Sequence, residues 1–265
     1  MNDRAGGYTA YQFTAEFYDH VEPYRERQDV AFFVEMAQES GGPVLEVGCG
    51  TGRVLIPTAR AGFEIVGLDL APLMLAACRE KLAQEPAEVQ ARVELVEDDM
   101  RAFDLGRQFA LVTIPFRPFQ HLITVADQIA CLKTIHRHLK PGGRLALDLF
   151  NPSLPYLADA ARLDEFGDEP GIIMPDGRRV LRRARIAARD YFNQIQDTEL
   201  TYYVTYPDGR QERRVHAFPM RYLFRFEAEH LLARCGFEVE ALYADYDRSP
   251  YGSKYPGELI FVARK

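Results

Sequence analysis

Val44-Leu45-Glu46-Val47-Gly48-Cys49-Gly50-Thr51-Gly52-Arg53 is the stretch that decides the fold. Two valines and a leucine run into three glycines at alternate positions, and a helical pattern follows. Because glycine has no Cβ and tolerates positive φ, the pattern predicts a buried strand that ends in a tight turn, where the backbone comes close to a ligand. A helix beginning near Arg53 would present unpaired N–H groups to whatever occupies the space above that turn.

The segments after this stretch repeat the alternation of strand and helix. Buried strands are predicted over 64–69, 93–96, 109–114 and 144–150, with helical patterns between them and a turn at Lys140-Pro141-Gly142-Gly143. Such βαβ units imply a parallel sheet with helices on both faces. The sequence therefore predicts a doubly wound α/β fold.

The pattern changes after residue 152. Two Pro-Asp-Gly turns, at 175–177 and 207–209, flank segments rich in β-branched and aromatic residues. This is typical of hairpins, so we expect a small antiparallel sheet inserted over about 170–224. A helix over 227–234 and two further strands would then complete the main sheet.

The composition narrows the class of protein. The 265 residues are 47% hydrophobic and 27% charged, which suits one large α/β domain or one domain with an insertion. A net charge of -7 argues against nucleic-acid and membrane partners. The four cysteines form no CxxC pair, so we expect no metal site and a reducing, cytoplasmic location. The first seven residues lack a signal-peptide pattern, and no apolar run approaches the ~20 residues that span a bilayer.

Polar residues follow several of the predicted strands. Ligands of such folds bind at the carboxyl ends of the strands, where the strand order reverses. Asp69 ends the second strand, 17 residues after Gly52, and a carboxylate there can accept hydrogen bonds from both hydroxyls of a ribose. The alternative is that Asp69 caps the helix predicted from Pro72.

The N-terminal segment is expected to cover this edge of the sheet. Apolar positions over 8–40 recur at helical spacing, with a break near Pro23 and an end at Ser40-Gly41-Gly42-Pro43. Tyr18-Asp19-His20 holds groups suited to a substrate pocket. The alternative is that Tyr18 only packs and that its two neighbours are solvated.

Together these motifs resemble a known family. Glu46 to Gly52 matches the ExGxGxG motif of class I S-adenosylmethionine-dependent methyltransferases, and Asp69, Asp99-Met100, the turn at 140–143 and Cys235-Gly236-Phe237 follow in that family's order. The chain looks most like small-molecule enzymes with an inserted antiparallel sheet, similar to glycine or nucleotide-sugar N-methyltransferases. The implied fold is a Rossmann-like, doubly wound, seven-stranded, mostly parallel sheet with a C-terminal β-hairpin and an inserted antiparallel cover sheet.

The resemblance also implies a division of the chain. Residues 1–42 would form helices covering the site, residues 43–152 and 225–265 the S-adenosylmethionine-binding core, and residues 153–224 the inserted cover. The cofactor would be S-adenosyl-L-methionine, with S-adenosyl-L-homocysteine as product and no metal. The partner would be a small-molecule methyl acceptor. A homodimer could form through the inserted sheet.

The resemblance assigns the cofactor-binding residues, which are Glu46, Gly48, Cys49, Gly50, Asp69, Leu70, Asp99, Met100, Pro115 and Phe116. Glu46 would face the amino group or the sulfonium, and the glycines would let the backbone approach the methionine part. Asp69 would take the ribose hydroxyls and Leu70 the adenine face. Asp99 would bond the adenine amine, and Phe116 would lie at the methionine end, next to the acceptor.

Methyl transfer from a sulfonium is an in-line displacement that depends mainly on positioning, which can supply ~7–11 kcal/mol. An amine acceptor can lose its proton to water, whereas a hydroxyl acceptor would need a general base. His121, just after the fourth strand, and Tyr18 are the candidate catalytic residues, although a lone histidine is more often structural. Six arginines over 178–189 form a basic patch that could hold a phosphate or carboxylate of the acceptor, or could be a solvated strand face or a subunit interface.

Three other functions compete with this interpretation, and one of them is an enzyme that uses the same cofactor for different chemistry. An NAD-dependent oxidoreductase would carry GxGxxG, but the position of its third glycine is Arg53. A non-catalytic S-adenosylmethionine-binding homologue stays open, because residues that bind a cofactor do not report turnover.

Overall fold

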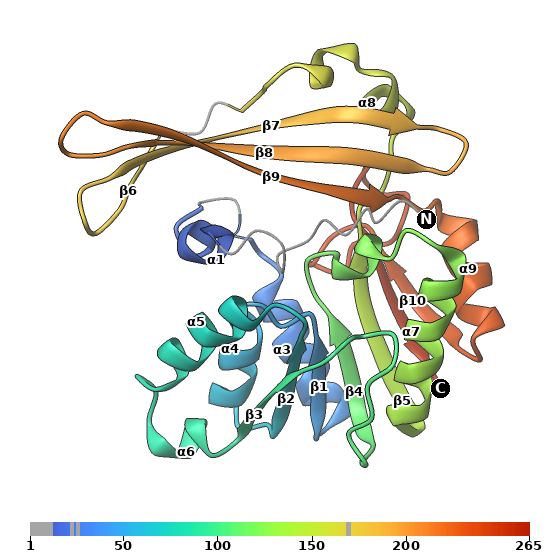
Figure 1. Ribbon diagram of the computed structural model, residues 1–265. Coiled ribbons are helices and arrows are strands. Elements are labelled where there is room, and N and C mark those ends of the chain that lie inside the picture. Colours follow the sequence, from blue (N-terminus) through green and yellow to red (C-terminus); the bar gives the residue numbers. More distant parts are fainter. Residues whose placement is uncertain (1–12, 22–23, 25–26, 168–170) are drawn as a thin grey trace.

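Two sheets organise the molecule. The computed structural model describes residues 13–21, 24, 27–167 and 171–265. A seven-stranded sheet forms the body, and a four-stranded antiparallel sheet stands over the carboxyl ends of its parallel strands (Figure 1). The predicted α/β fold with an inserted antiparallel sheet is therefore confirmed. Residues 1–12 and Pro23, which the prediction for the N-terminal segment included, lie outside the described residues.

The helices that lie wholly within the described residues are α1 (Phe13–Tyr18), α3 (Val30–Ser40), α4 (Leu55–Arg60), α5 (Pro72–Leu82), α6 (Ala87–Gln90), η1 (Pro118–His121), α7 (Val125–His138), α8 (Leu154–Ala158), η2 (Ala160–Leu163) and α9 (Arg225–Arg234). The strands are β1 (Val44–Val47), β2 (Ile65–Asp69), β3 (Val93–Glu97), β4 (Phe109–Ile114), β5 (Leu139–Leu149), β6 (Ile172–Ile173), β7 (Arg179–Asp190), β8 (Ile195–Thr205), β9 (Gln211–Arg221), β10 (Glu238–Tyr243) and β11 (Leu259–Arg264).

The seven-stranded sheet has the order β10-β11-β5-β4-β1-β2-β3. All neighbours are parallel except that β11 runs antiparallel to both β10 and β5, which makes the C-terminal hairpin. From β1 the chain moves one way through β2 and β3, and then crosses to β4 on the other side. The strand order thus reverses between β1 and β4, the place where such sheets bind ligands.

Alternate residues of these strands feed two hydrophobic cores. Leu45 and Val47 of β1 point to the core covered by α7 and α9, whereas Val44 points to the core covered by α3, α4 and α5. This two-sided burial explains why the strands read as nearly continuous apolar runs. Helices on both faces leave the carboxyl edge of the sheet as the place for a ligand.

The four-stranded sheet, which we call the cover sheet, has the order β6-β7-β8-β9. Its inner face is apolar, with Val180, Leu200 and Tyr202 packed around Phe17 of α1. The Phe17 and Tyr202 rings stack with centroids 5.4 Å apart. Helix α1 therefore fills part of the space between the two sheets (Figure 1).

Some predicted boundaries differ from the structure. Strand β5 begins at Leu139, because Leu139 pairs with Phe109 of β4 and the segment predicted as a turn at 140–143 is part of the strand. The helix after the glycine turn begins at Leu55 rather than near Arg53, since irregular turns occupy the residues between. None of the described helices is long and apolar enough to cross a membrane.

Gly67 of β2 gives a test of the core under α4. A Cβ built there would lie 2.2 Å from Cδ1 of Leu55 and 2.9 Å from Sγ of Cys49. Because both neighbours are buried, we expect Gly67→Ala to lower the free energy of unfolding by ~1–3 kcal/mol, the usual cost of overpacking. Urea denaturation would measure it.

The matched control is Gly171→Ala, where the added Cβ would meet only the Val180 carbonyl oxygen at 3.6 Å. Equal denaturation midpoints for the two variants would contradict this account of the packing between α4 and β2.

Candidate active site

The turn after β1 lies at the carboxyl edge of the sheet, where its glycines expose the backbone without side chains. Gly48, Gly50 and Gly52 have φ values of 74°, 53° and 83°, in the left-handed region that favours glycine. A Cβ on Gly48 would lie 2.8 Å from the side chain of Pro118 in η1. The turn after β1 and the segment after β4 are therefore packed against each other, with space only for a hydrogen at Gly48.

Glu46 lies on β1, two residues before this turn, and is 2% exposed. No described residue donates a hydrogen bond to its Oε2 atom. Burial raises the pKa of Glu46 well above its ordinary value, while the nearby Arg53 opposes that rise. Because buried polar atoms are normally paired, an unpaired carboxylate oxygen is typical of a site whose missing donor belongs to a ligand.

Asp69 ends β2 and bonds the glycine turn directly. Its Oδ2 accepts from the Gly50 N–H at 2.7 Å, and its Oδ1 accepts from the Ala71 N–H at 2.8 Å. Burial raises the pKa of Asp69, and these N–H groups oppose that rise. The alternative role as a helix cap is not realised, since α5 has no side-chain cap. The carboxylate keeps acceptor capacity for a ligand, and Leu70 beside it is half exposed.

Asp99 follows β3 and is already engaged by a neighbour. Arg101 donates to Asp99 from Nε at 2.9 Å and from Nη2 at 2.5 Å, and this pairing lowers the pKa of Asp99. Met100 beside it packs against the core on the α7 side. Arg101 therefore competes for this carboxylate with any adenine ring that would bind there.

Asp19, the residue after α1, contacts the glycine turn and α5. Oδ1 of Asp19 accepts from the Thr51 hydroxyl at 2.6 Å, and Oδ2 of Asp19 lies 2.8 Å from Nζ of Lys81. The Tyr18 ring stands 4.9 Å from that of Tyr24, and burial raises the Tyr18 pKa. A pocket of about 250 Å³ lies here, lined by Tyr18, Asp19, Tyr24, Arg53 and Lys81.

The residues after β4 have unusual backbone geometry. Pro115 is buried, and Phe116 and Arg117 have φ values of 64° and 69°, which non-glycine residues rarely adopt. Such conformations cost of order 1–3 kcal/mol each and cluster at functional sites. The turn aims the Phe116 ring at α1 and its neighbours, 5.1 Å from the ring of Tyr24 and 6.5 Å from that of Tyr18.

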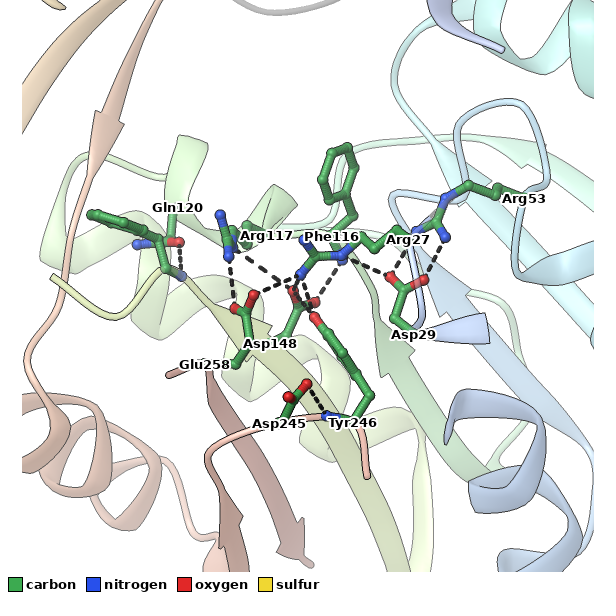
Figure 2. A network of polar contacts seen from close by, with 11 residues as sticks. Arg27, Asp29, Arg53, Phe116, Arg117, Gln120, Asp148, Asp245, Tyr246 and Glu258 are labelled. Atoms are coloured by element: carbon green, nitrogen blue, oxygen red, sulfur yellow. Dashed lines mark hydrogen bonds and ion pairs between the residues drawn. The ribbon is translucent and has the colours of Figure 1, made fainter. Parts of the chain in front are cut away.

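A buried carboxylate on β5 holds this turn in place (Figure 2). Oδ1 of Asp148 accepts from the Phe116 N–H at 2.5 Å, and Oδ2 accepts from Arg27 Nη2 at 2.9 Å and from the Tyr246 hydroxyl at 2.8 Å. The side chain of Asp148 is fully buried. Burial raises its pKa, and Arg27 and Arg117 oppose that rise. One carboxylate thus joins the N-terminal segment, the turn after β4 and the loop between β10 and β11.

The same network extends to the glycine turn. Asp29, also fully buried, accepts from Nη1 of Arg53 at 2.5 Å and from Nη2 at 2.8 Å, and Nε of Arg27 donates to it at 3.1 Å. At the other end, Nη2 of Arg117 donates to Glu258 at 2.6 Å. Figure 2 shows these residues converging from several elements on one network.

Two histidines meet where the cover sheet contacts η1. His121 of η1 and His216 of β9 stand 5.2 Å and 4.6 Å from the Phe218 ring. Burial lowers the pKa of His121 to about 4, and burial together with the neighbouring His121 lowers that of His216 to about 3. Both imidazoles are therefore neutral at pH 7.

The structure groups most of the predicted site residues at one edge. Gly50 bonds Asp69, and Tyr18 faces Phe116, whereas His121 lies apart from them against β9. The sequence analysis missed Asp148, Asp29 and Arg27. A charged residue inside the apolar run Leu145-Ala146-Leu147-Asp148-Leu149 was the one available signal.

Known proteins resemble this chain in sequence and in fold. A family model described as a methyltransferase domain matches residues 44–143. The chain is 30% identical over 228 residues to the cypemycin N-terminal methyltransferase of a Streptomyces species, covering 85% of this chain and 84% of that protein. The structure resembles the CcbJ methyltransferase from Streptomyces caelestis, with a TM-score of 0.73, 25% identity and 95% of each chain covered. It also resembles S-adenosylmethionine-bound CalS10, an amino pentose methyltransferase from Micromonospora echinaspora, with a TM-score of 0.66, 28% identity and 90% of each chain covered.

The fold and the site define an enzyme that binds a nucleoside cofactor at the switch point of a Rossmann-like sheet. The comparisons specify the family. The chain belongs to the class I S-adenosylmethionine-dependent methyltransferases.

The depressed pKa of His216 predicts a pH dependence of stability. An unfolded histidine titrates near 6.5, so the unfolded state binds more protons than the folded state between pH 6.5 and about 3. Stability is therefore lost as the pH falls through this window. Between pH 7 and pH 5, we expect the free energy of unfolding to fall by about 2 kcal/mol more in the wild type than in His216→Gln.

Urea denaturation at the two pH values would measure this difference, with His230→Gln, at an exposed position of α9, as the control. Parallel loss of stability in the wild type and His216→Gln would contradict the burial of a neutral imidazole.

Proposed function

We propose that the enzyme transfers a methyl group to an amine of a small-molecule acceptor by in-line displacement. The observation that carries the proposal is the contact of the cover sheet with η1, which places Phe218 against His121 close to the turn after β4. Two of the relatives described above, an N-terminal methyltransferase and an amino pentose methyltransferase, support a nitrogen acceptor. In this proposal residues 43–152 and 225–265 form the cofactor-binding core, and residues 1–42 and 153–224 form its cover.

The residues of the carboxyl edge fit S-adenosylmethionine. Oε2 of Glu46 lacks a donor among the described residues, and the ammonium or sulfonium charge of the cofactor would compensate it. The lone pairs left on Asp69 suit the ribose hydroxyls, and half-exposed Leu70 suits the adenine face. Gly48, Cys49 and Gly50 would provide backbone against the methionine part, since their turn has no space for larger side chains at Gly48.

The other proposed contacts follow the strand ends. Asp99 and Met100 would border the adenine, with Arg101 sharing the carboxylate of Asp99. Pro115 and Phe116 would border the methyl-transfer end. There the Phe116 ring, with Tyr18 and Tyr24 around it, offers aromatic faces that attract a cation.

When bound, S-adenosylmethionine supplies an electrophilic methyl group. The protein's part is to exclude water and to hold the acceptor nitrogen in line, which the cover sheet and α1 support by closing over the carboxyl edge. His121 would position the acceptor amine by accepting a hydrogen bond from it, because its imidazole is neutral above pH of about 4. The proton released by the amine would pass to water. Tyr18 would position the reacting groups through its hydroxyl and ring.

Calorimetric titration of S-adenosylhomocysteine tests the cofactor site. We expect micromolar binding to the wild type and at least tenfold weaker binding to Asp69→Asn, because a charge-assisted hydrogen bond is worth ~1.5–3 kcal/mol. Asp164→Asn, at an exposed position, is the control and should bind like the wild type. Tight NAD binding with no binding of S-adenosylhomocysteine would overturn the assignment of the pocket.

Radiolabelled methyl transfer tests the acceptor class and His121. We expect amino sugars, their nucleotide derivatives or peptides with a free N-terminus to be methylated, and the matching hydroxyl compounds not to be. For the best acceptor, His121→Asn should lower kcat roughly two- to tenfold, the effect of losing one positioning hydrogen bond of ~0.5–1.5 kcal/mol, and leave S-adenosylhomocysteine affinity unchanged.

His230→Asn controls for loss of a histidine elsewhere. An unchanged kcat in His121→Asn would assign His121 a structural role only. Methylation of the hydroxyl compounds alone would contradict the proposed amine acceptor and indicate an oxygen acceptor.

A further inference from the structure

Four side chains near the junction of the cover sheet with the segment after β5 hold buried N–H groups that make no hydrogen bond to a described residue. They are Nε2 of Gln196 and Nε of Arg189, Arg162 and Arg117, the last two lying 3.3 Å and 3.9 Å from carboxylate oxygens of Asp159 and Asp148. Because buried donors are normally paired, the donors on Arg189 and Gln196 point to an acceptor supplied by a ligand. We call these four residues the donor cluster.

Arg189 and Gln196 place part of the donor cluster on the inner face of the cover sheet. They lie directly opposite each other on β7 and β8, so their side chains share one face. Gln196 is on the same face as Leu200, which belongs to the core against α1, since residues four apart in a strand point the same way. Gln196 is only 5% exposed, so its amide faces the interior rather than bulk water.

The arginines of the donor cluster lie around Tyr156 of α8 and its neighbour Phe150. Cζ of Arg162 lies 4.2 Å from the Tyr156 ring centroid, and Nη2 of Arg189 lies 3.4 Å from the Tyr156 carbonyl oxygen. The Phe150 ring stands 4.9 Å from that of Tyr156, and Cζ of Arg117 is 5.6 Å from the Phe150 centroid. Three guanidinium groups thus surround one aromatic pair.

The ionisation of Tyr156 reflects this arrangement. Burial raises the pKa of its hydroxyl, and the positive charges of Arg162, Arg189 and Arg117 oppose that rise. Within the described part of the chain, no residue hydrogen-bonds this hydroxyl, so it too is available to a ligand.

Carboxylates balance only part of the positive charge. Oδ2 of Asp159 lies 3.3 Å from Nε of Arg162, and Glu258 accepts from Nη2 of Arg117. No carboxylate of a described residue forms an ion pair with Arg189, whose Nη2 donates to the Asp159 carbonyl oxygen at 2.9 Å. Arg189 is therefore the guanidinium of the cluster that has no carboxylate partner among the described residues, since Arg117 also lies 3.9 Å from Oδ2 of Asp148.

We propose that the donor cluster is a subsite for an anionic group of the methyl acceptor, a phosphate, diphosphate or carboxylate. This inference rests on the proposed function, because it takes the space under the cover sheet as the acceptor site. Arginine suits the role, since its planar group donates paired hydrogen bonds to such oxyanions. Arg117 directly follows Phe116, so the anion would be held beside the methyl-transfer end.

Calorimetry with simple anions tests the subsite without knowledge of the acceptor. The protein, saturated with S-adenosylhomocysteine, would be titrated with inorganic pyrophosphate, inorganic phosphate and acetate in separate experiments. We expect one class of anion to bind the wild type and to bind Arg189→Gln and Arg162→Gln at least tenfold more weakly. Binding of the phosphates alone assigns a phosphate-bearing acceptor, and binding of acetate alone assigns a carboxylate.

Arg183→Gln is the matched control, because Arg183 alternates with inward-facing residues of β7 and points to the outer face of the cover sheet. It should bind the anion like the wild type, and Arg189→Lys, which keeps the charge, should bind more tightly than Arg189→Gln. Absence of anion binding to the wild type, or an equal loss in Arg183→Gln and Arg189→Gln, would overturn the subsite.

S-adenosylhomocysteine binding, measured first for each variant, reports that the variant is folded. It also separates the two proposals. Failure of the wild type to bind S-adenosylhomocysteine would remove the proposed function, whereas normal S-adenosylhomocysteine binding without any anion binding would remove the subsite alone.

Discussion

The carboxylate of Asp148 is the constraint on which the site depends. It sits on β5 with no exposure and accepts hydrogen bonds from the Phe116 backbone, from Arg27 and from Tyr246. Removing one partner of such a buried pair leaves an uncompensated charge, which costs more than the pair itself contributes. The left-handed backbone at Phe116 and Arg117 persists because these contacts over-determine it, and that backbone points the Phe116 ring toward α1.

Helix α1 is also tied to other parts of the chain by charged side chains. At one end Glu16 pairs with Arg178 and Arg214 of the cover-sheet region, and at the other Asp19 meets Thr51 and Lys81 of the core. These pairs are partly exposed, and exposed pairs each contribute little to stability. The burial of Phe17 therefore does most to hold α1 in place, and the ion pairs fix its position.

Much of this architecture could be predicted because it rests on local patterns. The apolar run into alternating glycines predicted β1 and its turn, and hairpin chemistry at Pro-Asp-Gly predicted the cover sheet. The charge network could not be predicted, since Asp148, Asp29 and Arg27 meet only after distant segments pack together. Periodicity shows that an arginine lies on a strand, but its partner is set by tertiary contacts, as with Arg185 and Glu199.

The separate hydrogen-bond ladder of the cover sheet has a consequence for how such enzymes diversify. Backbone pairing between β8 and β9 holds the sheet whatever its side chains are, so inward positions such as Thr198, Phe218 and Met220 can change without disturbing the seven-stranded sheet. The methyltransferase family model matches residues 44–143 and ends before the cover sheet begins. Under the proposed function, substitutions on the cover sheet would therefore change the acceptor and leave the residues proposed for the methyl donor unchanged.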